Sequence, residues 1–221
     1  MLNLSYEEQV AQKRAKLQKT LQDFWTQDIP VTVTDEPRYF RNKVELGFCH
    51  QVKWREDYDK KDPANKTRPL EFESTLGFKL KGRWDRAVDI TECALFNENL
   101  IPLLNAIRAW AQAEKLEYYD QRKHTGVLRH LLVREGKNTG EEIVVLFVTD
   151  DFNEKTFVRA VESVLPKANI MAAVNNGLAD TAAPESLRVL KGKDFILEKI
   201  FLTDVHANLE REVTFKLSPQ S

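Results

Sequence analysis

Short β-strand patterns recur through most of this sequence and limit the folds that it can adopt. β-Branched and other apolar residues alternate with polar ones between turn residues, which predicts strands at 31–34, 41–48, 74–80, 86–90, 127–134, 142–149, 170–174, 187–190, 195–200 and 213–217. Apolar residues at helical spacing predict helices at 6–24, 97–114 and 154–165. Strands and helices do not alternate regularly, which disfavours a doubly wound parallel sheet. The sequence therefore predicts an α+β fold with a mixed, mostly antiparallel sheet and flanking helices.

The N-terminal part of the sequence differs from the rest. Ser5 and Glu8 have the spacing of a capping box, so we expect a helix to begin after Ser5, with a basic exposed face. We accordingly divide the chain into an N-terminal basic helix (1–30), an α+β domain (31–217) and a short C-terminal segment (218–221). Residues 53–71 carry many charges without periodicity, and we expect a long exposed loop there.

The charge balance excludes binding of nucleic acid by bulk charge. The 221 residues contain 33 Lys and Arg against 34 Asp and Glu, a formal net charge of −1. Positive charge is concentrated in three segments that also carry aromatic residues: 38–43, 79–86 and 118–136. Basic side chains hold phosphates while aromatic rings stack on unpaired bases, which is how looped RNA is usually bound. Each segment alone fits a solvated turn with a packed aromatic residue better, but the three segments together favour an RNA-binding surface.

The third segment contains a strand pattern with an unusual number of cations. Along 127–134, His130 and Arg134 share one face with leucines, while Arg129 lies on the other face among apolar residues. Burying such side chains without partners is costly. They are therefore either paired inside the protein or line a surface that binds an anion, and the residues alone leave both alternatives open.

Several classes of enzyme have no support in the sequence. It contains no Gly-x-Ser-x-Gly elbow, no His-Glu-x-x-His or Cys-x-x-Cys pair, and no glycine-rich nucleotide loop. Cys49 is followed by His50, but neighbouring strand residues point to opposite faces, so we assign no catalytic thiol. No apolar run is long enough for a membrane span and no signal peptide is visible, so we expect a cytoplasmic protein without a membrane partner.

The basic segments, in this order, resemble the RNA uracil-C5 methyltransferases, which methylate carbon 5 of uridine in bacterial 23S ribosomal RNA and in the tRNA T loop. The matching blocks cover essentially the whole chain and are specific as a set: Leu4-Ser-Tyr-Glu-Glu-Gln9, Tyr39-Phe-Arg-Asn-Lys-Val-Glu-Leu46, Gly82-Arg-Trp-Asp85, Val88-Asp-Ile-Thr-Glu-Cys93, His124-Thr-Gly-Val-Leu-Arg-His-Leu131 and Phe215-Lys-Leu-Ser-Pro-Gln-Ser221.

The resemblance implies that this chain is the central, RNA-recognising domain of such an enzyme. Its partner would be a structured RNA, a loop of rRNA or tRNA, and the expected contact residues are Arg41, Lys43, Arg83, Arg122, His124, Arg129, His130 and Arg134. The resemblance places S-adenosylmethionine, the nucleophilic cysteine and the base in a Rossmann-like methyltransferase domain following residue 221. We therefore expect no catalytic residue and no cofactor within these 221 residues.

Cys93 matches the fourth cysteine ligand of a 4Fe–4S cluster in the ribosomal RNA branch of the family. The other three ligand positions have no counterpart in this sequence, so we expect no cluster here, and the match favours 23S rRNA as the target. The alternative hypothesis is a non-catalytic protein-interaction module of α+β fold whose basic residues are paired internally.

Overall fold

The structure is a computed structural model that describes residues 4–53, 70–178, 184–204 and 209–219. The chain divides into two compact units, Met1–Phe40 and Arg41–Ser221. Most of the loop expected at 53–71 lies outside the described residues.

The first unit contains one helix, α1 (Tyr6–Leu21), which begins as the sequence predicts. The hydroxyl of Ser5 accepts a hydrogen bond from the Glu8 amide, and the Glu8 carboxylate accepts one from the Ser5 amide, which completes the capping box. None of the residues of α1 is buried. The predicted strand 31–34 is wrong: these residues form no strand, and the Thr34 amide instead donates to the Tyr6 hydroxyl. A strand pattern forms a strand only where a neighbouring strand pairs with it, and none does so among the described residues of this unit.

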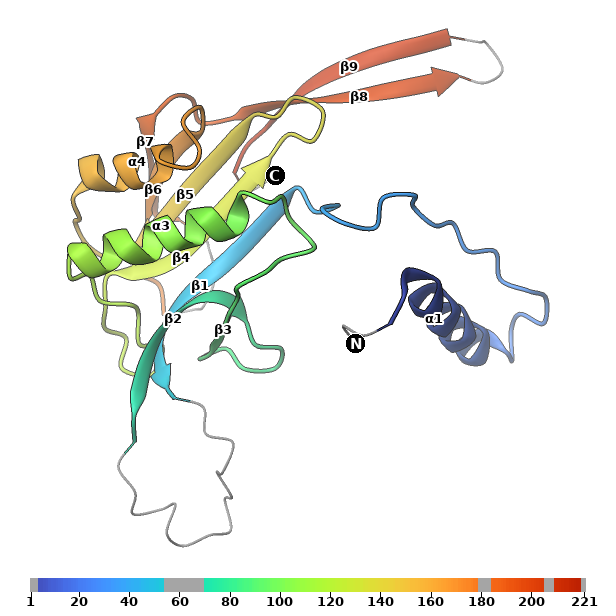
Figure 1. The fold of residues 1–221 in the computed structure, drawn as a ribbon, viewed down its shortest axis with the longest axis horizontal. Coiled ribbons are helices and arrows are strands. Elements are labelled where there is room, and N and C mark those ends of the chain that lie inside the picture. Colours follow the sequence, from blue (N-terminus) through green and yellow to red (C-terminus); the bar gives the residue numbers. More distant parts are fainter. Residues whose placement is uncertain (1–3, 54–69, 179–183, 205–208, 220–221) are drawn as a thin grey trace, which may run out of the picture. The chain divides into compact units, whose positions relative to one another are not determined.

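The second unit is built on a seven-stranded sheet with the order β3-β2-β1-β4-β5-β6-β7 (Figure 1). Its strands are β1 (Lys43–Val52), β2 (Phe72–Lys79), β3 (Ala87–Asp89), β4 (Leu128–Glu135), β5 (Glu142–Val148), β6 (Asn169–Val174) and β7 (Ser186–Lys191). Among these seven strands, β5 and β6 pair in parallel and all other neighbours pair antiparallel. The predicted α+β class with a mixed, mostly antiparallel sheet is therefore confirmed.

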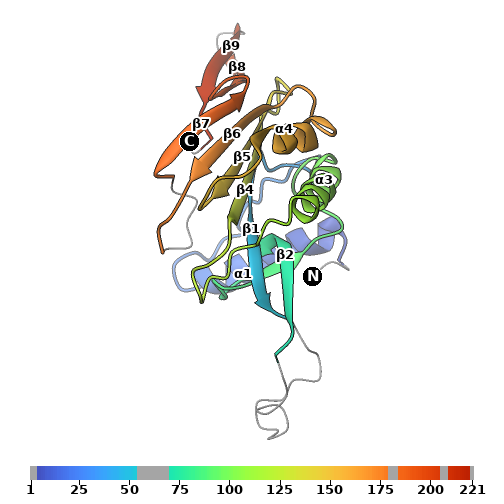
Figure 2. The same cartoon turned by 90° about the vertical axis from the view of Figure 1, so that its left-hand side faces the viewer.

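Two helices, α3 (Leu100–Ala113) and α4 (Glu154–Glu162), cover the same face of the sheet (Figure 2). Alternate residues of the strands point to this face, so β1 contributes Val44, Leu46 and Phe48 to the main core. The Trp110 side chain of α3 packs on Phe157 of α4 with ring centroids 5.0 Å apart. These contacts fix both helices on the sheet.

The opposite face of the sheet carries a smaller apolar cluster, which includes Leu132, Phe147 and Met171. The hairpin of β8 (Ile196–Asp204) and β9 (Leu209–Leu217) reaches this cluster through Ile196 and Leu217 and then extends as a two-stranded ribbon (Figure 1). Among the described residues, no helix combines the length and the apolar character needed to cross a membrane.

The segment 114–126 connects α3 to β4 and lies beside the second half of β1. The His50 amide of β1 donates to the Tyr119 carbonyl, and the Tyr119 amide donates to the Leu128 carbonyl. Gly126 adopts φ +111°, and a Cβ at this position would lie 2.5 Å from the Tyr118 carbonyl oxygen, so the close approach requires glycine.

Candidate nucleic-acid interface

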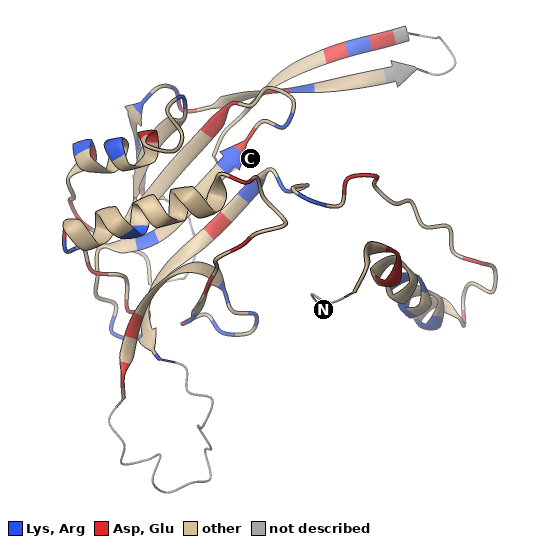
Figure 3. Cartoon of the chain, in the orientation of Figure 1, with Lys and Arg blue, Asp and Glu red and all other residues tan. Residues whose placement is uncertain are grey.

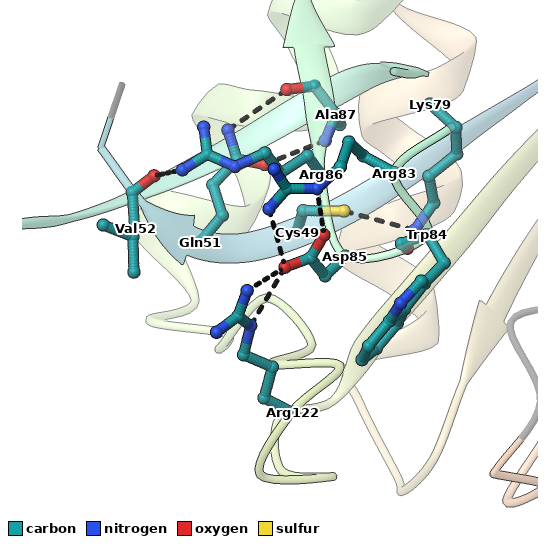
Figure 4. Close-up of polar contacts among 10 residues, drawn as sticks. All are labelled: Cys49, Gln51, Val52, Lys79, Arg83, Trp84, Asp85, Arg86, Ala87 and Arg122. Carbon is teal, nitrogen blue, oxygen red and sulfur yellow. Dashed lines mark hydrogen bonds and ion pairs between the residues drawn. The ribbon is translucent and has the colours of Figure 1, made fainter. Parts of the chain in front are cut away.

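Two of the predicted RNA-contacting arginines meet at one buried carboxylate. Arg83 and Asp85 lie in the turn between β2 and β3, and Arg122 lies in the loop before β4. The Asp85 carboxylate accepts hydrogen bonds from Arg83 Nε at 3.2 Å and from Arg122 Nε and Nη2 at 2.9 Å and 2.6 Å (Figure 4). The Asp85 side chain is 7% exposed, whereas those of Arg83 and Arg122 are 45% and 61% exposed. Asp85 thus holds two guanidinium groups that keep contact with solvent.

The two arginines also set the ionisation of Asp85. Burial by itself would raise the pKa of this carboxyl, but the hydrogen bonds and positive charges of Arg83 and Arg122 outweigh burial and lower it to about 2. Asp85 is therefore ionised throughout the physiological pH range, and it keeps both arginines in place.

The same turn presents an exposed tryptophan. Lys79 Nζ donates to the Trp84 carbonyl at 3.2 Å, and the Gln51 side chain pairs with both the amide and the carbonyl of Ala87 (Figure 4). Arg86 donates to the Val52 carbonyl at 2.6 Å. With its backbone fixed on both sides, the turn leaves the indole of Trp84 57% exposed. We call the group Arg83, Trp84, Asp85, Arg86 and Arg122 the Asp85 cluster.

The loop that carries Arg122 is held by hydrogen bonds among its own residues. The Asp120 carboxylate accepts from the amides of Arg122 and Lys123 at 2.9 Å and 3.1 Å, and the His124 amide donates to the Asp120 carbonyl at 2.8 Å. Burial would raise the pKa of Asp120, but these amides and the Lys123 charge lower it. Arg122, Lys123 and His124 are all exposed on this loop.

A second exposed aromatic ring lies at the start of β2. Phe72 is 43% exposed, and the imidazole of His50 stacks on it with centroids 5.2 Å apart and an interplanar angle of 7°. Lys123 Nζ lies 5.2 Å from the centroid of the same ring. Neither Phe72 nor Lys123 is among the predicted contact residues. Phe72 lies outside the three basic segments, and only the pairing of β1 with β2 brings it beside His50.

Figure 3 shows several Lys and Arg residues in the turn between β2 and β3, while the other cations are spread over the fold. Arg41 and Lys43, both predicted to contact RNA, lie at the start of β1, whereas Arg86 and Ala87, where this turn ends, contact Val52 and Gln51 at the other end of β1. Lys43 pairs in register with Arg134, and the Arg41 amide donates to the Leu95 carbonyl. The structure therefore groups Arg83, Arg122 and His124 at one end of β1, and Arg41 and Lys43 at the other.

Three of the predicted contact residues are buried. Arg129 is fully buried: its Nη1 donates to the backbone and side-chain oxygens of Asn175 at 2.9 Å and 3.1 Å and to the Gly177 carbonyl at 2.5 Å, and its guanidinium lies 4.4 Å from the Tyr119 ring centroid. Arg134 donates to the Ser218 carbonyl at 2.7 Å. The His130 ring packs edge-on against Phe147. These three side chains contact other residues inside the protein and do not line an exposed groove.

The two cysteines lie apart. Cys49 is buried, with Lys79 Nζ 3.3 Å from its sulfur, while His50 faces the other side of the sheet. Cys93 is half-buried against the main core. Across the described ranges, no three His, Cys, Asp or Glu side chains are grouped so that they could hold a metal ion. The donors present there therefore do not fit a 4Fe–4S cluster, which needs about four ligands.

Comparison with known proteins relates the chain to RNA-modifying enzymes. No protein-family model matches it. It is 28% identical over 177 residues to an uncharacterized RNA methyltransferase of Clostridium tetani, covering 78% of this chain and 35% of that protein. It is 27% identical over 210 residues to the tRNA (uracil(54)-C(5))-methyltransferase of Pyrococcus abyssi, covering 93% of this chain and 43% of that protein.

The fold has a counterpart among solved structures. The crystal structure of the Pyrococcus abyssi tRNA (uracil-54, C5)-methyltransferase in complex with S-adenosyl-L-homocysteine superposes with a TM-score of 0.65 and 22% identity, over 99% of this chain and 44% of that one. The chain spans less than half the length of these relatives. It thus has the fold of one part of that enzyme and is similar in sequence to proteins named RNA methyltransferases.

Proposed function

We propose that this chain is the RNA-recognition part of an S-adenosylmethionine-dependent RNA (uracil-C5)-methyltransferase that acts on a structured loop of 23S rRNA. The observation that carries the proposal is the Asp85 cluster, in which two guanidinium groups are fixed on one carboxylate beside an exposed tryptophan. The names of the sequence relatives support it. The choice of 23S rRNA rests on the position of Cys93 in the resemblance.

The chemistry of the cluster suits an unpaired RNA strand. Arg83 and Arg122 each use part of their guanidinium on Asp85 and keep other N–H donors for phosphate oxygens. The Trp84 ring is free to stack on a base, which is worth about 1–3 kcal/mol per base in complexes of this kind. His124, Arg41 and Lys43 remain proposed contacts because they are accessible, whereas we assign Arg129, His130 and Arg134 to the support of the fold.

Burial of those three residues is the observation that favours the alternative function, a protein-interaction module with internally bound cations. The two functions differ in what the exposed cluster binds. The alternative predicts that a stem–loop RNA binds weakly and equally to the wild type and to variants of the Asp85 cluster.

The test is RNA binding by the 221-residue chain, measured by fluorescence anisotropy with a labelled stem–loop RNA that contains unpaired uridines. Trp84→Ala should weaken binding about tenfold, since one stacked base is lost. Arg83→Ala should reduce the slope of log Kd against log salt concentration by about 1, because one phosphate contact is lost.

Lys167→Ala is the matched control. Lys167 is exposed just before β6, and the register of β4, β5 and β6 places it at the opposite end of the sheet from the Asp85 cluster. Unchanged binding by both Trp84→Ala and Arg83→Ala would contradict the proposal. Stem–loops from 23S rRNA and from the tRNA T loop, compared in the same assay, test the target: tighter binding of the tRNA loop would overturn the choice of 23S rRNA alone.

A further inference from the structure

A pocket of about 700 Å³ lies on the helix-covered side of the sheet, between the end of α3, strands β1 and β2, and the loop that carries Arg122. Its volume is in the usual range of small-ligand sites. The side chains that give it chemical character are those of His50, Arg108, Lys115, Tyr118, Asp120 and Lys123. We call it the α3 pocket. It shares His50 and Asp120 with a small cavity that Asp85 and Arg122 line, so it adjoins the Asp85 cluster.

Two aromatic side chains of the α3 pocket are held in fixed positions. The His50 imidazole is stacked on Phe72, and its Nδ1 lies 3.3 Å from the Ser74 hydroxyl. The Tyr118 ring packs edge-on against Phe48 with centroids 4.9 Å apart. Burial raises the pKa of the Tyr118 phenol, so its hydroxyl keeps its proton and can donate to a carbonyl oxygen of a base.

The cations of the α3 pocket differ in how they are engaged. Arg108 donates to Asp89 at 2.5 Å and to the Leu76 carbonyl, and Lys123 Nζ lies 3.7 Å from the Asp120 carboxylate. Within the described part of the chain, Lys115 has no ion pair. The carboxylates of Glu117 and Asp120 add negative charge to the pocket lining, but Asp120 already accepts hydrogen bonds from two backbone amides. Lys115 is therefore the cation best placed to meet an incoming phosphate.

The backbone of Lys115 has a conformation that is unusual for a residue with a side chain. Its amide donates to the Gln112 carbonyl and the Leu116 amide donates to the Ala111 carbonyl, which is the hydrogen-bond pattern that ends a helix with a left-handed residue. Lys115 has φ +55°, in the region that favours glycine. Glycine adopts this conformation without the steric cost of a Cβ, so Lys115→Gly removes the cation while keeping a backbone that fits the helix end.

We propose that the α3 pocket receives one unpaired nucleotide of the bound RNA, with its base against His50 and its phosphate at Lys115. This inference rests on the proposed RNA-recognition function. It adds a site for a single nucleotide on the helix-covered side of the sheet, next to the phosphate and base contacts proposed for the Asp85 cluster.

The decisive variant is Lys115→Gly, because it removes the cation while relieving the backbone. We expect its midpoint of thermal unfolding to be equal to or higher than that of the wild type. Its binding of the labelled stem–loop RNA should be several-fold weaker, with a salt slope reduced by about 1. His50→Leu should also weaken binding of the stem–loop RNA, but without a change in the salt slope, since it removes a base contact. Neither variant should change binding of a fully paired RNA duplex, which has no unpaired nucleotide to offer.

The outcomes separate this inference from the proposed function. If Trp84→Ala weakens stem–loop binding while Lys115→Gly and His50→Leu do not, the pocket has no such role and the proposed function stands. Equal losses for the stem–loop and the duplex would also overturn the inference, because Lys115 would then contact the backbone of any RNA. If the wild-type chain binds no stem–loop RNA, the proposed function itself fails.

Discussion

Asp85 is the residue on which the geometry of the candidate interface depends, because two arginines are held by one carboxylate. A single uncharged substitution would release both guanidinium groups at once. Neither arginine would then keep the orientation in which it is seen, although both would remain in the sequence. The effect of Asp85 on RNA binding therefore acts through the arginines.

The ionisation of Asp85 makes the stability of the protein depend on pH. Its pKa is lowered from 3.8 to about 2 in the folded protein, so its stabilising effect is complete above about pH 5 and is lost as the pH falls through about 2. Asp85→Asn should lower the free energy of unfolding by about 2 kcal/mol at pH 7 and by much less near pH 2. Urea denaturation at the two pH values measures this. Asp151→Asn, at an exposed position, is the control and should show no such difference; a loss for Asp85→Asn that is the same at both pH values would contradict the expectation.

At the scale of elements, Arg129 joins β4 to the residues that follow β6. Its guanidinium donates to oxygens of Asn175 and Gly177, so two segments far apart in the sequence depend on one side chain. Arg129→Ala should cost about 3 kcal/mol or more, because buried carbonyl oxygens would lose their donor. The measurement is chemical denaturation, with the exposed Arg159→Ala on α4 as the matched control. A loss below about 1 kcal/mol would mean that water replaces the guanidinium.

Most elements could be predicted from the sequence, since each has a local signal. The expected helix 97–114 and strand 142–149 correspond to α3 (Leu100–Ala113) and β5 (Glu142–Val148), where periodicity and burial agree. The strand expected at 31–34 failed because β-branched residues favour extended backbone but do not supply a partner strand. Which strands pair with one another depends on the whole sheet and cannot be read from the sequence of a single segment.

The candidate site could be predicted only in part, for the same reason. Arg83 and Arg122 stand out as cations near aromatic residues, but the carboxylate that joins them is visible only once β2, β3 and the loop before β4 are packed together. For Arg129 and Arg134 the sequence left burial and exposure as alternatives, and the backbone carbonyls that bind them lie 46 and 84 residues away. The RNA contacts themselves stay predictions.

At the scale of the whole molecule, the two units differ in how they are stabilised. The unit Arg41–Ser221 has its own core, whereas α1 in the unit Met1–Phe40 buries none of its residues. Because every residue of the main core lies in the second unit, a chain of residues 41–221 should still unfold in one cooperative transition in urea. Loss of the cooperative transition would contradict this expectation. The fully buried Leu104→Ala, which should cost about 2–5 kcal/mol, shows that the assay detects a core change.

The two edges of the sheet also bear on how the molecule behaves in solution. An unpaired strand edge is a template on which another chain can add a strand. Here one edge strand, β3, is only three residues long, and the other, β7, is tied to α4 by ion pairs of Arg188 with Glu154 and of Lys191 with Glu162. A short edge and a charged edge both discourage such addition. The seven-stranded sheet therefore leaves another copy of the chain little free edge on which to add a strand.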